Sequence, residues 1–124
     1  MTVGKSKPDC IFCRVVAGEL PSTKVFETET VLAFQDVNPG APQHILVIPK
    51  DHVADSIADL DLTDSDVAQT WADLLAVAQE VAGSKSEFAK GWRFVTNVGE
   101  NGGQSVFHLH LHLLAGRRLA WPPG

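Results

Sequence analysis

The chain of 124 residues predicts a single α+β domain built on an antiparallel sheet of about five strands. Several strand-like runs surround one long amphipathic helix, and the links between the runs are too short for repeated βαβ crossovers. The length suits one hydrophobic core with little room for a second. We therefore expect a flexible polar N-terminus over residues 1–9 and one folded domain over residues 10–124.

The first half of the chain predicts a short helix followed by three strands. Residues 10–17 favour a short helix that a glycine then ends. Residues 23–26 and 30–35 are strand-like, and the short polar link between them indicates an antiparallel hairpin. Two prolines and a glycine make residues 36–42 a loop, after which the β-branched run 44–49 predicts a buried strand.

The second half predicts the long helix and two more strands. The helix should begin at Thr63 as the N-cap, with Asp66 three residues later. Its apolar stripe at helical spacing consists of Val67, Trp71, Leu74, Leu75, Ala78, Val81 and Ala82. Gly83 is expected to end the helix in the left-handed conformation. Residues 92–97 and 106–114 then predict the last two strands.

Charge and hydropathy exclude several classes of partner. Ten basic against fifteen acidic residues leave a net charge of −5, and no cluster of lysine or arginine could neutralise many phosphates. Polymeric nucleic acid is therefore not an expected partner. No apolar run approaches the roughly 20 residues that span a bilayer, and the first residues do not form a secretory signal. We expect a cytoplasmic protein with no membrane partner.

Three histidines at alternate positions, His108, His110 and His112, are the strongest functional feature of the sequence. In an extended chain this spacing turns all three imidazoles toward one face. The residues that would face the other side are Phe107, Leu109, Leu111 and Leu113. Surface or packed histidines are the plain alternative, and strict alternation of three disfavours it. A glycine-rich loop at residues 99–104 precedes the row, so backbone N–H groups and imidazoles together indicate chemistry on a phosphate.

The row favours a nucleophile over a metal site of three histidines. The first and third Cα atoms of such a strand lie about 13 Å apart, whereas zinc needs its nitrogen ligands at about 2 Å. A neutral imidazole is a competent nucleophile, and water can hydrolyse the resulting phosphorus–nitrogen intermediate. His110, in the middle, is the expected attacker, with donors from Gly103, Gln104 and Ser105. Ser105 is also placed to interact with a leaving group, although a hydroxyl that merely begins a strand is an equal alternative.

Cys10 and Cys13 are the only cysteines, and their spacing is that of half a tetrahedral zinc site. Two histidines outside the row, His44 and His52, make a Cys2His2 site feasible, and such a site would be structural because no position stays open. An unmetallated reduced pair and a redox pair remain alternatives, whereas a structural disulfide is disfavoured without a signal peptide. His44 could equally be a core histidine.

Residues 102–114 resemble the motif of the histidine triad (HIT) nucleotide-binding proteins, HφHφHφφ with φ apolar. The resemblance continues through Phe12, residues 32–36 and residues 41–50, and the tail at residues 115–124 is similar to the Hint branch. It implies a HIT-like fold and a homodimer. It also implies hydrolysis of purine nucleoside 5′-phosphoramidates to a nucleoside monophosphate and an amine through a nucleotidylated histidine.

The same resemblance implies a role for individual residues. The catalytic residues would be His110 as nucleophile with His112, Ser105 and His44. The nucleotide-binding residues would be Ile11, Phe12, Phe34, Asp36, Val37, Asn97, Gly103, Gln104, Ser105, Val106, His110 and His112. Within that set an ionised Asp36 could accept hydrogen bonds from both ribose hydroxyls. The ligands of a structural zinc would be Cys10, Cys13, His52 and His108.

Two other functions stay open at this point. A dinucleoside polyphosphate hydrolase or nucleotidyl transferase of the same fold would use the same histidine with a different leaving group. A nucleotide-binding or interaction module without catalysis belongs to another class, and the intact row with Ser105 speaks against it.

Overall fold

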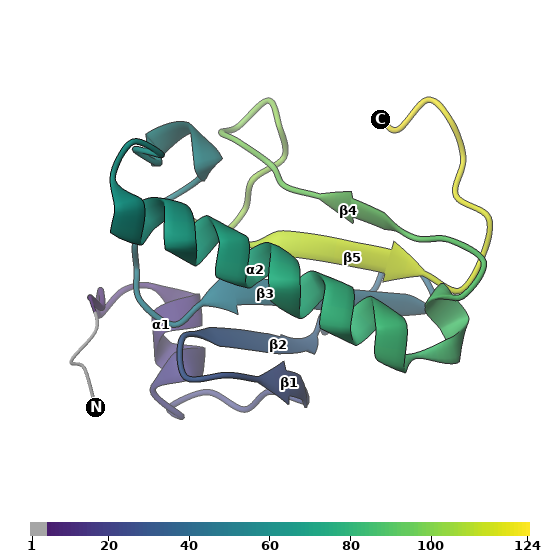
Figure 1. The fold of residues 1–124 in the computed structure, drawn as a ribbon, viewed down its shortest axis with the longest axis horizontal. Coiled ribbons are helices and arrows are strands. Elements are labelled where there is room, and N and C mark those ends of the chain that lie inside the picture. Colours follow the sequence, from purple (N-terminus) through teal and green to yellow (C-terminus); the bar gives the residue numbers. More distant parts are fainter. Residues whose placement is uncertain (1–4) are drawn as a thin grey trace.

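The computed structural model describes residues 5–124 and confirms the α+β fold, with one sheet in the strand order β1-β2-β3-β5-β4 (Figure 1). The strands are β1 (Lys24–Glu27), β2 (Val31–Gln35), β3 (Gln43–Pro49), β4 (Arg93–Val95) and β5 (Leu111–Ala115). All neighbouring strands pair antiparallel, as the short links predict. Residues 1–4 of the predicted flexible N-terminus lie outside the described residues.

Two α-helices and two short 3₁₀ turns accompany the sheet. They are α1 (Ile11–Val16), η1 (Ile57–Asp59), α2 (Ser65–Ser84) and η2 (Ser86–Phe88). The predicted short helix is confirmed, and Cys10 serves as its N-cap because its Sγ accepts a hydrogen bond from the N–H of Cys13. None of the helices within residues 5–124 combines the length and the apolar character needed to cross a membrane.

The start of α2 differs from the prediction by one residue. Asp64, not Thr63, is the N-cap, and its carboxylate accepts hydrogen bonds from the N–H groups of Asp66 and Val67. Thr63 instead donates its N–H to the side chain of Asp61 in the preceding turn. Two adjacent residues can both cap a helix, and the ionised carboxylate gains from the helix dipole as well.

The prediction for the end of α2 is wrong in a similar way. Gly83 lies inside the helix and does not adopt a positive φ, and the helix ends at Ser84 before Lys85 becomes extended. The hydroxyl of Ser84 donates to the carbonyl of Val81, so a side chain contributes to the hydrogen bonding of the last turn.

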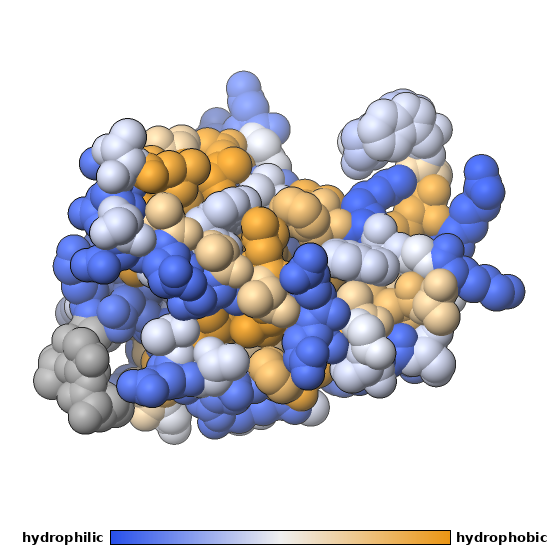
Figure 2. All heavy atoms as spheres, in the orientation of Figure 1, coloured by the Kyte–Doolittle hydropathy of each residue, from blue (hydrophilic) through white to orange (hydrophobic). Residues whose placement is uncertain are grey.

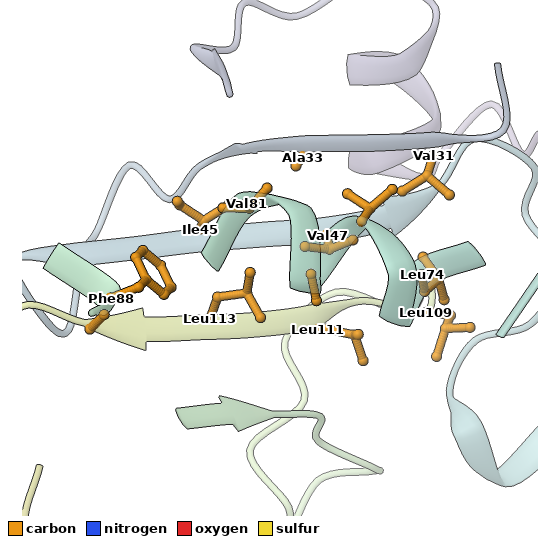
Figure 3. Close-up of a cluster of buried hydrophobic side chains, with 13 residues drawn as sticks. Val31, Ala33, Ile45, Val47, Leu74, Val81, Phe88, Leu109, Leu111 and Leu113 are labelled. Atoms are coloured by element: carbon orange, nitrogen blue, oxygen red, sulfur yellow. The ribbon is translucent and has the colours of Figure 1, made fainter. Parts of the chain in front are cut away.

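The main hydrophobic core lies between α2 and one face of the sheet (Figures 1 and 3). Leu74, Ala78 and Val81 of the predicted stripe are buried there, together with Val77, which the predicted stripe omits. The sheet residues of this core include Val31, Ala33, Ile45, Val47, Leu111, Leu113 and Ala115. Hydrophilic side chains dominate the outer surface around α2, with apolar patches between them (Figure 2).

The opposite face of the sheet carries a second cluster built around α1. Its buried members are Cys10, Phe12, Cys13, Val15, Leu32, Phe34, Leu46 and Ile48. Alternate residues of β2 and β3 therefore enter different clusters, which explains why both strands are buried almost throughout.

The histidine row begins before its strand does. The predicted strand over residues 106–114 is regular only from Leu111, where pairing with β3 and β4 becomes possible. Earlier in the segment, the N–H of Leu109 donates to the carbonyl of Ala54, so a loop rather than a strand holds it. The predicted alternation is nevertheless kept from Leu109 onward, whereas Phe107 is exposed rather than part of the core.

Candidate active site and metal cluster

The hydrogen bond of His110 leaves one of its ring nitrogens without a proton. Nδ1 lies 2.7 Å from the carbonyl oxygen of His108, and because a carbonyl only accepts, Nδ1 must carry the proton in the neutral ring. Nε2 then holds a lone pair. Burial lowers the pKa of His110, which favours this neutral form. The structure therefore presents an imidazole with the electronic state of a nucleophile.

A relay of hydrogen bonds gives His112 the opposite state. The N–H of Gly40 donates to Nδ1 of His44 over 2.8 Å, so the proton of His44 is on Nε2. That Nε2 lies 2.9 Å from Nδ1 of His112 and donates to it. The proton of His112 is consequently on Nε2, which is buried and has no hydrogen-bond partner among the described residues. The ring centroids of His110 and His112 are 5.0 Å apart, so a ring with a free lone pair lies beside a ring with a free N–H.

Asp36 joins this relay at its first imidazole. Its Oδ2 lies 3.3 Å from Nε2 of His44, and its Oδ1 accepts from the N–H of Asn38. Asp36, His44 and His112 bring three potential ligand atoms within 4.8 Å. Since Nδ1 of His44 already accepts from Gly40, a metal on Nε2 would require both nitrogens of one neutral ring to have lone pairs. The group is therefore suited to carry a proton rather than a metal ion.

The glycine-rich loop before the row is held by its own hydrogen bonds. The side chain of Gln104 accepts from the N–H of Gly99 and donates to the carbonyls of Asp55 and Val106. Gly102 packs so closely on the backbone of Val98 that a Cβ atom would clash with it. The loop is thus a fixed structure that sets the position of the residues after it.

The backbone donors predicted in this loop are partly engaged. The N–H of Gly103 donates to Glu100, and that of Gln104 donates to Gly99. In residues 5–124, by contrast, no acceptor faces the N–H of Ser105 or Val106. Ser105 is exposed and Val106 half-buried, so these two N–H groups are among the donors open to an incoming anion.

The residues predicted to bind a base divide into buried and exposed members. Phe12 and Phe34 are buried and meet edge to face at 5.6 Å, and Phe12 also contacts the ring of His110 at 5.1 Å. Ile11 and Val37 expose 51% and 87% of their surface. Both apolar side chains therefore face solvent rather than the core. Asn97 follows β4 and is half-buried.

The four predicted metal ligands come together. Cys10, Cys13, His52 and His108 are all buried, and their ligand atoms lie within 4.8 Å of one another. Sγ of Cys13 lies 3.4 Å from Nδ1 of His52, and Nδ1 of His108 lies 3.4 and 3.5 Å from the two sulfurs. A tetrahedral zinc with ligands at about 2.3 Å for sulfur and 2.0–2.1 Å for nitrogen requires sulfur–nitrogen separations of about 3.6 Å. The cluster fits zinc.

The protonation states of the cluster also suit a cation. Nε2 of His108 donates to the carbonyl of Pro49 and Nε2 of His52 donates to Asp55, so both Nδ1 lone pairs face the thiols. The hydrogen bond from His52 lowers the pKa of Asp55. Burial raises the pKa of the Cys10 thiol, a cost to the thiolate that a bound cation offsets.

Residues of the polar N-terminus are tied to this cluster. The N–H of Lys7 donates to Sγ of Cys13, and its carbonyl accepts from the N–H of Cys10. The ammonium group of Lys7 lies 3.6 Å from Asp55. Asp55 was not among the predicted site residues, although its position three residues after His52 is a spacing at which a carboxylate can reach an imidazole.

Acid should destabilise the fold in part through His112. Burial, with help from the neighbouring His110 and His44, lowers the pKa of His112 from 6.5 to about 4. Between pH 6.5 and about pH 4, His112 is protonated in the unfolded chain but not in the folded one. The free energy of unfolding therefore decreases as pH falls, by up to about 1.4 kcal/mol per pH unit. Urea unfolding of wild type and His112→Asn at pH 7 and pH 5 would measure this. Equal losses in both proteins would contradict the prediction.

The structure thus combines, on a small α+β fold, an imidazole with a free ring lone pair, a neighbouring imidazole with an unpartnered N–H and a Cys2His2 cluster. The HIT domain family model matches residues 17–119. The chain belongs to the HIT domain family, and the fold predicted from its histidine motif is confirmed.

Similar proteins include enzymes and proteins named for zinc. A "14 kDa zinc-binding protein" of Zea mays is 46% identical over 92% of this chain and 87% of its own length. "Adenylylsulfatase HINT1" of Arabidopsis thaliana is 44% identical over 92% of this chain and 76% of its own. A solved HIT family hydrolase of Legionella pneumophila Philadelphia 1 has a TM-score of 0.84 and 46% identity, covering 94% of this chain and all of that one. The chain is therefore related to hydrolases.

Proposed function

We propose that this protein is a nucleoside phosphoramidase, a hydrolase that cleaves the phosphorus–nitrogen bond of purine nucleoside 5′-phosphoramidates. The observation that carries the proposal is the pair of opposite protonation states at His110 and His112. One ring offers a lone pair for phosphorus and its neighbour offers an N–H for a phosphoryl oxygen. A binding module without catalysis would not need a buried, unpartnered N–H beside a free lone pair.

The proposed reaction has two displacements at phosphorus. Nε2 of His110 attacks and the bond from phosphorus to the amine breaks. The amine leaves with one proton taken from solvent, and Ser105 is the proposed contact of the leaving group. The product is a nucleotidyl group bonded to His110. Water then attacks phosphorus and gives one proton back to solvent, and the electron pair of the phosphorus–nitrogen bond returns to Nε2, which releases the nucleoside monophosphate. During both steps the Nε2–H of His112 and the backbone N–H groups of Ser105 and Val106 would stabilise negative charge on the phosphoryl oxygens.

The nucleotide would lie on the face of the sheet that carries α1. Phe12 and Phe34, with Ile11 and Val37, are proposed to contact the base, and an exposed apolar side chain is consistent with a surface that a ligand covers. Asp36 is proposed to bind the ribose. Its contact with His44 would then link the sugar site to the imidazole relay. Asn97, Gly103 and Gln104 complete the proposed phosphate side, the last two by shaping the loop.

The proposed metal ligands are Cys10, Cys13, His52 and His108, holding a structural zinc. The donor set of two sulfurs and two imidazole nitrogens supports zinc over magnesium or calcium. Zinc would cross-link α1 to the loop after β3 and to the histidine row. With four protein ligands it would have no open coordination position for a reacting water. The free thiols suit the reducing cytoplasm that we propose as the location.

We also propose a homodimer. The edge strand β4 is only three residues long, yet Trp92, Phe94 and Val98 in and beside it are 39–43% exposed. Apolar side chains along an unpaired sheet edge are typical of a surface that another chain covers.

Parallel assays with three leaving groups would test the proposed function. An adenosine phosphoramidate with a neutral amine should be hydrolysed with the highest kcat/KM, ahead of a diadenosine polyphosphate and of adenylyl sulfate. Adenylyl sulfate is included because one relative is named an adenylylsulfatase. A preference for either anhydride would replace the proposal by that activity, and binding of AMP without turnover of any of the three would favour the non-catalytic module.

A further inference from the structure

Phe12 connects the metal cluster with the imidazole of His110. It stands on α1 between Cys10 and Cys13, so any cation held by the cysteines also fixes the part of the helix that carries its ring. Its ring meets His108 edge to face at 5.9 Å and 75°, and meets His110 at 5.1 Å and 88°. One aromatic ring therefore packs against a member of the metal cluster and against the proposed nucleophile.

A second connection runs through His108 itself. Its imidazole is part of the cluster, with Nε2 bonded to Pro49 and Nδ1 facing both sulfurs. Its backbone carbonyl accepts the hydrogen bond that decides where the proton of His110 resides. His108 precedes the regular part of β5, so no sheet ladder fixes this carbonyl, and the same peptide group is held on its other side by the N–H of Leu109, which donates to Ala54. The side chain of His108 is thus a second anchor of the acceptor that His110 uses.

We propose that the metal cluster is the positioning device of His110, acting through the carbonyl of His108 and the ring of Phe12. In an ordered cluster both contacts hold the ring of His110 in one orientation, with Nδ1 donating and Nε2 free. Without the metal, α1 and His108 lose their common anchor, and His110 can rotate or exchange tautomers. The inference about turnover rests on the proposed function, whereas the inference about the ring does not.

The first experiment removes the metal at the ligand that belongs neither to residues 10–16 nor to the histidine row. His52→Gln takes away one proposed ligand without altering α1 or residues 105–112. Zinc content is measured on the purified protein, with a chelator added if metal persists, and far-UV circular dichroism reports folding. Long-range ¹H–¹⁵N spectra of histidine-labelled protein then report the tautomer of His110 without any substrate. We expect one tautomer in wild type and averaged or broadened signals in the variant, with kcat lowered on the order of 10²-fold.

A second variant tests the ring with the metal in place. Phe12→Leu keeps an apolar side chain but loses the edge contacts to both imidazoles, and it should lower kcat more than it raises KM while zinc content stays unchanged. Leu20→Ala is the matched control, because Leu20 packs against the same buried cluster and has no ring contact with His110. The control should lose stability without a change in the tautomer of His110.

The outcomes separate this inference from the proposed function. A folded, zinc-free His52→Gln protein in which His110 keeps one sharp tautomer would overturn the positioning role, whatever the activity. Should that variant unfold, Phe12→Leu decides, and an unchanged His110 spectrum there would overturn the role equally. Should His110 respond to metal loss while wild type hydrolyses no nucleotide, the positioning role stands and the proposed function fails.

Discussion

Replacing His110 by alanine should lower kcat/KM for an adenosine phosphoramidate by at least about 10³-fold while AMP still binds. The lone pair on Nε2 is the only group proposed to form a bond to phosphorus, so its loss removes the covalent route rather than weakening it. The residues proposed to contact base and ribose are untouched, and calorimetry with AMP should report a dissociation constant within a few-fold of wild type.

Covalent capture gives this prediction a direct readout. Wild type mixed with substrate and quenched within milliseconds should gain the mass of one nucleotidyl group, and His110→Ala should gain none. His110→Gly with free imidazole in the buffer is a useful companion, because partial rescue would show that the missing element is an imidazole lone pair. Turnover by His110→Ala at the wild-type rate would exclude the proposed nucleophile.

Removing the metal should cause the largest loss of stability. A ligand that binds only the folded state stabilises it by about 4 kcal/mol when its free concentration exceeds its dissociation constant a thousandfold. Cys13→Ser removes one sulfur from a cluster whose four donors come from α1, the loop after β3 and the histidine row. We expect purified wild type to contain one zinc per chain, and we expect Cys13→Ser to contain none and to unfold at lower urea concentration.

A chelator provides the control for this second prediction. It should bring the Tm of wild type close to that of Cys13→Ser and leave the variant unchanged. The core between α2 and the sheet contains none of the four ligands, so both metal-free proteins should keep most of their helical circular dichroism signal. Carefully purified wild type without zinc would remove the structural site from the proposal.

The sequence predicted the parts of the fold that depend on periodicity. Alternation placed Leu109, Leu111 and Leu113 on the core side, and helical spacing found Leu74 and Val81. Element ends were less certain because they depend on competition between neighbours. Thr63 and Asp64 both satisfy the composition of an N-cap, and only the three-dimensional position of the N–H groups decides between them.

For the site, the sequence predicted which residues meet and not the state in which they meet. Cys10 and Cys13 were recognised from spacing, and the resemblance supplied their histidine partners. The protonation states could not be predicted, because they depend on the N–H of Gly40 and the carbonyl of Pro49, and nearly every residue has such backbone groups. No pattern of side chains in a sequence identifies which backbone group will face a given imidazole.

The segment from Leu109 to Ala115 sends neighbouring side chains alternately to the core and to the opposite side, and this limits how its length can change. Insertion of one residue within it would exchange the two sets on one side of the insertion, placing leucines where the imidazoles lie and imidazoles in the hydrocarbon interior. The turn at Gly99–Gln104 is held by its own hydrogen bonds and positions this segment, so its length is constrained as well. Changes aimed at new leaving-group specificity should therefore replace side chains and keep the number of residues from Gly99 to Ala115.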